Sequence, residues 1–371
     1  RIGRGGGMTH SLAAVFEGVP DQIALRELPL PPLSETETLV RVLGCTLCGS
    51  DLHSFEGRRA VPTPTVLGHE IVGEIIDRSR QAVTRDLAGN ELRVGDRVTW
   101  AIVAHCGECF FCRNDLPQKC QNGVKYGHEP FRPGRELLGG LAEHCLLVAG
   151  TSLVRLPDDL PLAVACPASC ATATIAAALE AAGELRERCV CLFGAGMLGL
   201  TACAMARSRG AREVVCVDPS RPRRELALRF GATRVAATGE FDTVASETVG
   251  DLGFDAVIEL SGNPAAFEAA WPRVRVGGTL VLVGSVYPAA PVSVALEQVV
   301  RRHLTIRGVH NYKPRHLLAA VEFLAACQHE FPFEALVAGW FPLRSIAEAF
   351  AASREPSVIR VGVGGRVPPR P

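Results

Sequence analysis

The chain contains 371 residues, in which 39 lysines and arginines balance 39 aspartates and glutamates. This length exceeds the size at which one hydrophobic core keeps growing, so we expect two domains. The even charge balance argues against a nucleic-acid or membrane-surface partner and favours a small molecule. We expect a cytoplasmic protein, because no apolar run is long enough to cross a bilayer and the N-terminus lacks the basic-then-apolar order of a secretory signal. The stretch RIGRGGG before Met8 is expected to contribute nothing to the fold.

The first part of the chain, from about residue 10 to 165, has the pattern of a β-rich domain. Short apolar or alternating runs such as TLVRVLG (38–44), IVGEII (71–76) and DRVTWAIV (96–103) are separated by proline and glycine clusters. This spacing of strands and turns is typical of an all-β or barrel-like architecture.

A cysteine cluster interrupts this β-rich part. Cys106, Cys109, Cys112 and Cys120 have the spacing C-x2-C-x2-C-x7-C within a lobe at about residues 105–121. Four thiolates this close suit a tetrahedral zinc ion, whereas disulfides are disfavoured in a reducing compartment. An iron–sulfur cluster, which also takes four thiolates, stays open as an alternative. Because protein ligands would fill all four positions of a zinc ion, we expect a structural site.

Eight of the remaining cysteines lie in apolar or alanine-rich surroundings. In such sequence contexts a cysteine is expected to be a small core residue. These eight are Cys45, Cys145, Cys166, Cys189, Cys191, Cys203, Cys216 and Cys327.

The second part of the chain alternates apolar strand-like runs with helix-like segments from about residue 170. The runs include CVCLFGAG, EVVCVD, DAVIEL, TLVLVG and LTIRGV. Such alternation predicts a parallel sheet covered by helices on both faces. A terminal strand-like run, VIRVGV, is expected to return to the first domain.

A glycine motif follows the first of these strands. In GAGMLG, we expect Gly194 to permit a tight turn, Gly196 to let the backbone approach a pyrophosphate, and Gly199 to bring helix and strand together. Met197 and Leu198 lie in the same motif, at the start of the expected helix, whose N-terminus supplies amide donors. Asp218, which ends the next strand, would accept hydrogen bonds from the adenosine ribose.

The Asp218 carboxylate would repel a 2′-phosphate, so we favour NAD over NADP. Arg221, Arg223 and Arg224 follow closely and weaken that preference, unless they form a solvated helix face.

Three further fragments offer a set of catalytic groups: LCGSDLH (47–53), GHE (68–70) and SCATAT (169–174). A cysteine, a histidine and a second cysteine from separate loops would bind zinc and leave one position open for water or substrate. Asp51 would then orient His69 through a hydrogen bond behind the metal.

In the order of these motifs, the chain resembles the zinc-dependent medium-chain alcohol dehydrogenases over essentially its whole length. The resemblance implies an α/β protein with a partly β, GroES-like catalytic domain at 8–165, completed by about 310–371. It places a Rossmann domain at 166–309, with zinc in the cleft between the two domains.

The resemblance also implies the ligands of a catalytic zinc ion. They would be Cys48, His69 and Cys170, with Glu70 either ligating or swinging into the ligand shell. Cys170 is preferred to the nearby Cys166 because CATAT continues into a helix-like segment. The implied activity transfers a hydride between an alcohol and NAD, with zinc acting as a Lewis acid.

A proton route is implied by the same motif. Ser50, the nicotinamide ribose and His53 would carry the proton away during alcohol oxidation, and an imidazole with a pKa near 6.5 suits this relay.

The substrate is less defined. Segments such as KYGHE (125–129) and RGVHNY (307–312) are similar to those of a subgroup of alcohol dehydrogenases associated with phosphonate catabolism. Cationic or donor groups for an anionic tail would come from Arg58, Arg59, Lys125, His128 and His310. The alternatives are a polyol dehydrogenase of the sorbitol or threonine type and a non-catalytic protein that binds zinc and nucleotide.

The expected partners are a small alcohol or aldehyde and further copies of the chain. The family resemblance implies a homodimer or homotetramer, with LTIRGV as a plausible edge strand for pairing. We expect no nucleic-acid or membrane partner.

Overall fold

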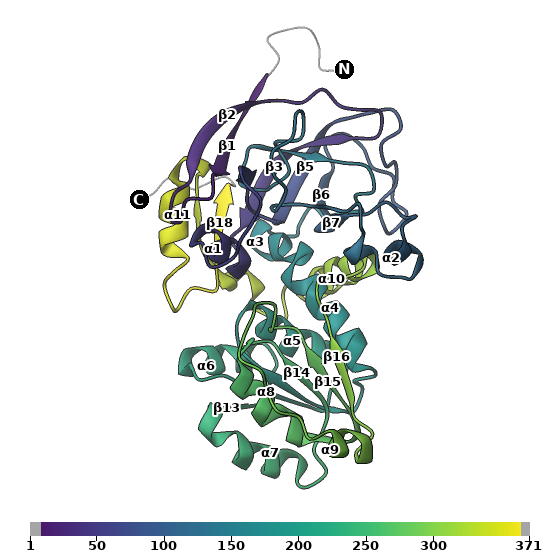
Figure 1. Ribbon diagram of the computed structural model, residues 1–371, viewed down its shortest axis with the longest axis vertical. Coiled ribbons are helices and arrows are strands. Elements are labelled where there is room, and N and C mark those ends of the chain that lie inside the picture. The colour runs from purple at the N-terminus through teal and green to yellow at the C-terminus, as the bar shows by residue number, and fades with distance from the viewer. Residues whose placement is uncertain (1–8, 365–371) are drawn as a thin grey trace. The chain divides into compact units, whose positions relative to one another are not determined.

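The computed structural model describes residues 9–364, which form two compact units (Figure 1). Among the described residues, the first unit contains 9–170, 313–328 and 333–364. The second unit contains residues 171–312 and 329–332. These bounds differ by a few residues from the expected ones. The stretch before Met8 lies outside the described residues.

The main sheet of the first unit has seven strands. Its order is β10-β6-β5-β3-β18-β17, and β9 also pairs with β3. The C-terminal strand β18 is antiparallel to β3 and parallel to β17, so residues far apart in the chain complete one sheet. The bounds are β3 (Thr38–Thr46), β5 (Glu70–Arg78), β6 (Arg97–Trp100), β9 (His144–Leu147), β10 (Leu153–Arg155), β17 (Val337–Phe341) and β18 (Arg360–Gly364).

Two smaller sheets lie in the same unit. One contains β1 (His10–Phe16) between β2 (Ala24–Pro29) and β4 (Thr65–Val66), and the other pairs β7 (Val103–Ala104) with β8 (Val124–Lys125). Helices connect the strands of this unit: α1 (Gly49–Phe55), α2 (Phe110–Arg113), α3 (Leu162–Ala165), α10 (Pro314–Cys327) and α11 (Ile346–Ala352).

Apolar side chains from the main sheet and from α11 form one core. Val40, Ile71 and Trp100 come from three neighbouring strands, and each is almost fully buried. Phe55 at the end of α1 stacks on Phe350 of α11, with ring centroids 4.0 Å apart. A pair of aromatic rings in contact stabilises the fold by more than the burial of their apolar area alone. This contact therefore fixes α1 on the unit.

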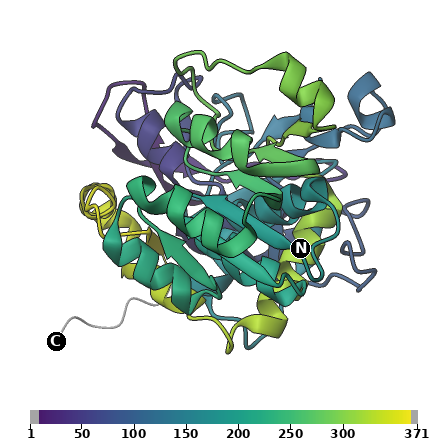
Figure 2. The ribbon, with the colours of Figure 1, turned by 90° about the horizontal axis from the view of Figure 1, so that it is seen from below.

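The second unit is built on a six-stranded parallel sheet in the order β13-β12-β11-β14-β15-β16. Helices flank both faces of this sheet (Figure 2), and β11 is buried along its whole length, as expected for a covered parallel sheet. The strands are β11 (Cys189–Phe193), β12 (Glu213–Val217), β13 (Arg234–Ala236), β14 (Phe254–Glu259), β15 (Val274–Leu282) and β16 (Thr305–Gly308). The helices are α4 (Ala171–Ala182), α5 (Met197–Ser208), α6 (Arg221–Arg229), α7 (Phe241–Val249), α8 (Pro264–Ala270) and α9 (Leu296–Arg301). The predicted fold class, an α/β protein with a partly β unit and a unit built on a doubly wound parallel sheet, is therefore confirmed.

The eight cysteines that were expected to be core residues are all buried. No single helix within residues 9–364 combines the length and apolar character needed to cross a membrane. Only one bent pair, 162–169 with 171–182, meets that criterion when its two helices are taken together.

The glycine motif forms the turn from β11 into α5. Gly194 has φ +103°, a left-handed conformation that favours glycine. Gly199 lies so close to Gly194 that a β-carbon on Gly199 would meet the Gly194 carbonyl oxygen at 1.8 Å. Gly196, by contrast, has no described atom within 4 Å of such a β-carbon.

This contrast yields a matched pair of variants. Gly199→Ala should lower the melting temperature by several degrees, because overpacking of this kind typically costs about 1–3 kcal/mol or more. Gly196 has φ −79° and open space around the position of a β-carbon, so Gly196→Ala should leave the melting temperature unchanged. Thermal unfolding followed by circular dichroism measures both. Equal melting temperatures for the two variants would contradict the close helix–strand contact.

Candidate functional site

The buried carboxylate of Asp51 joins α1 to the loop before β5. One oxygen accepts a hydrogen bond from the Cys48 amide at 2.9 Å, and the other accepts one from the Gly68 amide at 3.0 Å. Asp51 is only 1% exposed. Cys48, which immediately precedes α1, is thereby fixed beside the residue that follows Gly68, His69.

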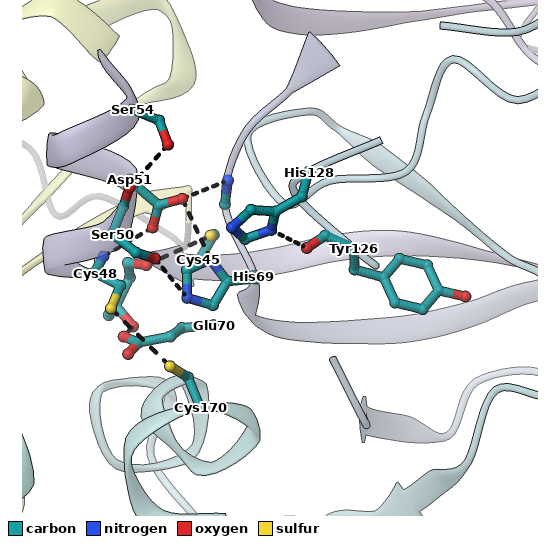
Figure 3. A network of polar contacts seen from close by, with 12 residues as sticks. Cys45, Cys48, Ser50, Asp51, Ser54, His69, Glu70, Tyr126, His128 and Cys170 are labelled. Atoms are coloured by element: carbon teal, nitrogen blue, oxygen red, sulfur yellow. Dashed lines mark hydrogen bonds and ion pairs between the residues drawn. The ribbon is translucent and has the colours of Figure 1, made fainter. Parts of the chain in front are cut away.

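His69 lies between Asp51 and Ser50. Its Nδ1 is 3.3 Å from a carboxylate oxygen of Asp51, and its Nε2 is 3.5 Å from the Ser50 hydroxyl (Figure 3). Burial disfavours the imidazolium, but Asp51 and Cys48 favour it more and raise the pKa of His69 to about 10. With Nδ1 directed at Asp51, Nε2 is the nitrogen presented to a metal, which is the arrangement predicted from the sequence.

Cys48, His69 and Cys170, here called the ligand trio, come together in the first unit. Their ligand atoms all lie within 4.8 Å of one another, and the two sulfurs are 4.0 Å apart (Figure 3). A tetrahedral zinc ion with zinc–sulfur distances of about 2.3 Å needs sulfurs about 3.8 Å apart. The donor set and spacing therefore fit zinc.

Ser169 explains why Cys170 and not Cys166 joins the trio. The Ser169 hydroxyl donates to the His69 carbonyl oxygen at 3.1 Å and accepts from the Ile71 amide at 3.4 Å. These bonds hold the segment just before Cys170 against β5, whereas Cys166 is fully buried in the core. A hydrogen bond from Cys170 lowers the pKa of Cys48 and raises that of Cys170.

Glu70 is occupied by other partners. Its carboxylate accepts from both Nε and Nη2 of Arg360, at 2.9 and 3.0 Å, and from the Thr46 hydroxyl at 2.6 Å. It is not one of the ligand trio. Arg360 Nη2 also lies 3.6 Å from the Cys48 sulfur, so this arginine connects Glu70 to the trio. Sequence reasoning missed Arg360, which is far from every motif.

His53 lies one helical turn after Ser50 on α1 and is half-buried. Burial, together with the nearby Arg58, lowers its pKa from the usual value. Ser50 and His53 are thus on the helix that begins directly after Cys48, as the expected proton route requires.

The four-cysteine lobe forms a second group. The sulfurs of Cys106, Cys109, Cys112 and Cys120 lie within 4.8 Å of one another. Cys120 is 3.5 Å from Cys106 and 3.8 Å from Cys109, close to the spacing in a tetrahedral zinc–thiolate site. Amide donors from Cys112 and Gln121 lower the pKa of Cys109 to about 6, which favours the thiolate that a metal needs.

The expected nucleotide site lies where the strand order of the second unit reverses, between β11 and β14. Dinucleotides bind at such switch points. The open space at Gly196 leaves room for a ligand at the N-terminus of α5, where Met197 and Leu198 begin the helix. Asp218 is buried and accepts from the amides of Ala195 and Ser220, at 2.7 and 2.8 Å.

Glu259, at the end of β14, was not foreseen. Its buried carboxylate accepts from the amides of Ser261 and Gly262, at 2.6 and 2.8 Å. This loop borders the glycine turn, because a β-carbon on Gly194 would lie 3.3 Å from the Ser261 nitrogen. Glu259 therefore shapes the wall of the switch point from a strand that carries no recognisable motif.

The expected contacts for an anionic tail do not all lie together. Arg58 is exposed and pairs with Glu56, and His310 belongs to the second unit. Arg59, Lys125 and His128 belong to the first unit, and the His128 ring lies 5.3 Å from that of His69.

Comparison with known proteins gives matches across both units. The alcohol dehydrogenase GroES-like domain matches residues 34–158, and the zinc-binding dehydrogenase domain matches residues 198–326. An L-threonine 3-dehydrogenase of Aeromonas hydrophila is 31% identical over 340 residues, which are 87% of this chain and 93% of that protein. The crystal structure of an alcohol dehydrogenase from Thermotoga maritima aligns with a TM-score of 0.89 at 26% identity, over 97% of this chain and 100% of that one. The alcohol dehydrogenase TADH from Thermus sp. ATN1 aligns with a TM-score of 0.84 at 28% identity, over 96% and 100%.

The predicted enzyme class, an oxidoreductase acting on CH–OH groups, is confirmed by these matches, and zinc and a nicotinamide dinucleotide are the cofactors of this class. The three relatives are named for threonine or alcohol oxidation and not for phosphonate chemistry. The chain belongs to the zinc-dependent medium-chain alcohol dehydrogenase family.

Proposed function

We propose that this protein oxidises a polar alcohol with NAD, at a zinc ion held by Cys48, His69 and Cys170. The observation that carries this proposal is the ligand trio itself. Two sulfurs and one imidazole nitrogen converge, and no fourth histidine, cysteine or acidic ligand joins them among residues 9–364. Three protein ligands and an open position are the pattern of catalytic zinc, whereas the filled four-cysteine set is the pattern of structural zinc.

When bound, zinc supplies Lewis-acid polarisation of the substrate oxygen, and nicotinamide accepts the hydride. The protein's own groups set up this chemistry. Asp51 holds His69 in the tautomer that presents Nε2, and Arg360 keeps Glu70 out of the trio. The Ser50 hydroxyl, next to His69, takes the alcohol proton and passes it toward His53.

The preference for NAD is supported by Asp218. Its carboxylate lies where a 2′-phosphate would meet a negative charge. Two of the arginines that follow it have internal partners: Arg224 donates to the carbonyl oxygens of Asp218 and Pro219, and Arg221 pairs with Glu225. These two side chains therefore already have partners within the chain.

The relatives support a substrate of the threonine or polyol type, because the L-threonine 3-dehydrogenase covers nearly the whole chain. An alcohol with a phosphonate group is the second candidate. The positively charged side chains beside the ligand trio favour it, and they are treated below.

We also propose a homodimer or a homotetramer. Within the described sheet, β16 is an edge strand paired only with β15, and its Ile306 is 39% exposed. Exposed apolar edge strands are available for pairing with a second copy.

A matched pair of cysteine variants tests the two zinc assignments. Cys48→Ala should abolish NAD reduction with threonine, sorbitol, a hydroxyalkylphosphonate and simple alcohols, while the melting temperature changes little. Cys109→Ala should lower the melting temperature, because a structural metal site contributes directly to folding. Absorbance of NADH and thermal unfolding provide the readouts. Full activity of Cys48→Ala, with any of these alcohols, would contradict the proposal.

The proton route predicts a pH dependence. His53 must be neutral to accept a proton. Because its pKa is lowered from 6.5, the ring stays neutral at pH 6.5 and above. The kcat/KM for alcohol oxidation should therefore fall only at pH values below 6.5. His53→Gln should lower kcat by about 10²-fold and remove this acid limb, with partial rescue by added imidazole. An unchanged pH profile in the variant would exclude His53 from the route.

A further inference from the structure

The turn that follows β8 carries polar groups that the proposed chemistry does not use. Gly127, in this turn, approaches Gly68 so closely that a β-carbon would lie 2.7 Å from the Gly68 carbonyl oxygen. The next residue, His128, places its ring beside that of His69, at 5.3 Å (Figure 3). The turn is therefore held at the edge of the ligand trio.

Two cations near this turn have no acidic partner. Lys125, the last residue of β8, and Arg59, just after α1, are both half-buried. Neither side chain forms an ion pair or hydrogen bond with any residue that the structure describes. Burial lowers the pKa of Lys125 to about 8, and the charge of Arg59 adds to this effect. Two neighbouring cations that are partly shielded from water are unfavourable unless an anion pairs with them.

His128 contributes an acceptor and not a cation. Its ring is 8% exposed, and its Nδ1 lies 2.9 Å from the Tyr126 carbonyl oxygen. A carbonyl oxygen only accepts, so Nδ1 carries the proton and Nε2 carries a lone pair. Among the residues 9–364, Nε2 has no hydrogen-bond partner, and Figure 3 shows it on the side of the ring that faces His69 and Asp51. In this tautomer of the neutral ring, His128 offers the site an acceptor, which differs from the cationic or donor role expected from the sequence.

We propose that Arg59 and Lys125 bind an oxyanion on the substrate, while His128 Nε2 accepts a hydrogen bond from a donor on the same molecule. This inference rests on the proposed function and specifies its substrate as an alcohol that carries a carboxylate or a phosphonate. A planar guanidinium pairs with either anion through two parallel hydrogen bonds, and the lysine adds a second charge. The carbinol then lies at the ligand trio, and the anionic end lies at Arg59 and Lys125.

Matched charged and neutral alcohols test the proposal with the zinc-loaded enzyme and NAD. The pairs are 3-hydroxybutyrate with its amide, and 2-hydroxypropylphosphonate with its dimethyl ester. At least one acid should have a kcat/KM at least about tenfold above that of its neutral partner, and the larger ratio identifies the anion. Lys125→Met should reduce that ratio by about 10- to 150-fold, the range of a charge-assisted hydrogen bond, mainly through KM. Lys125→Arg should restore most of it.

The control is Arg93→Met, because Arg93 is exposed and forms an ion pair with Glu91. This variant should leave the kcat/KM unchanged for both the acid and the neutral alcohol of each substrate pair. No preference for either acid would overturn the proposal. An equal loss for acid and neutral partner in Lys125→Met would also overturn it, since that result indicates a structural role.

Binding of butyrate and propylphosphonate separates this proposal from the proposed function. These anions have no hydroxyl group, so calorimetry measures their binding without turnover. Wild-type protein should bind at least one of them, and Lys125→Met should bind it at least about tenfold more weakly. If no alcohol reduces NAD but this difference is found, the dehydrogenase proposal fails and the anion subsite stands. Absent binding, or equal binding by both proteins, overturns the subsite.

Discussion

The site depends on one buried carboxylate. Asp51 accepts hydrogen bonds from the amides of Cys48 and Gly68 and lies beside His69 Nδ1. A buried donor that loses its partner costs about 1–3 kcal/mol, so loss of Asp51 would leave the amides of Cys48 and Gly68 unpaired and would remove the negative charge beside His69 Nδ1. The same carboxylate therefore fixes the backbone of two segments and the orientation of one ligand. This double use explains how a cysteine and a histidine from separate loops keep a metal-binding geometry.

A second buried pair supports this arrangement from the C-terminal strand. Arg360 lies on β18, which joins β3 in the main sheet, and its guanidinium holds Glu70 in two hydrogen bonds. The pair leaves no net charge next to the two thiols of the trio. Removal of one partner of a buried pair typically costs about 3–5 kcal/mol, because the other charge remains buried. Strand pairing and site electrostatics are thus coupled through a single residue.

Much of the fold and site follows from local sequence patterns. Residues near each other in the chain determine the glycine turn, the four-cysteine spacing and the buried strands of the second unit. These features can therefore be predicted from sequence patterns. Cys170 was preferred to Cys166 because the residues after it look like the start of the family's helix, and the Ser169 hydrogen bonds supply the physical reason. Arg360 and Glu259 were not foreseen, because their roles arise from long-range pairing and from the position of a strand end in the sheet.

The substrate contacts show the same limit. A list of cationic side chains is readable from the sequence, but their partners are not. Arg58 is neutralised by Glu56, whereas Lys125 has no described acidic partner. His128 donates to the Tyr126 carbonyl oxygen and so becomes an acceptor toward the site. Only the three-dimensional structure shows that Arg58 pairs with Glu56 at the surface, whereas the adjacent Arg59 is a candidate contact for an anion.

The most direct test of this account is the location of zinc in the purified protein. A crystal structure with anomalous scattering measured above and below the zinc absorption edge should show two ions per chain. One should lie among the four cysteines of the lobe, and the other should be bound by Cys48, His69 and Cys170 with a non-protein fourth ligand. An occupied lobe with no zinc at the trio, or a zinc ion there coordinated by a fourth protein side chain, would contradict the account.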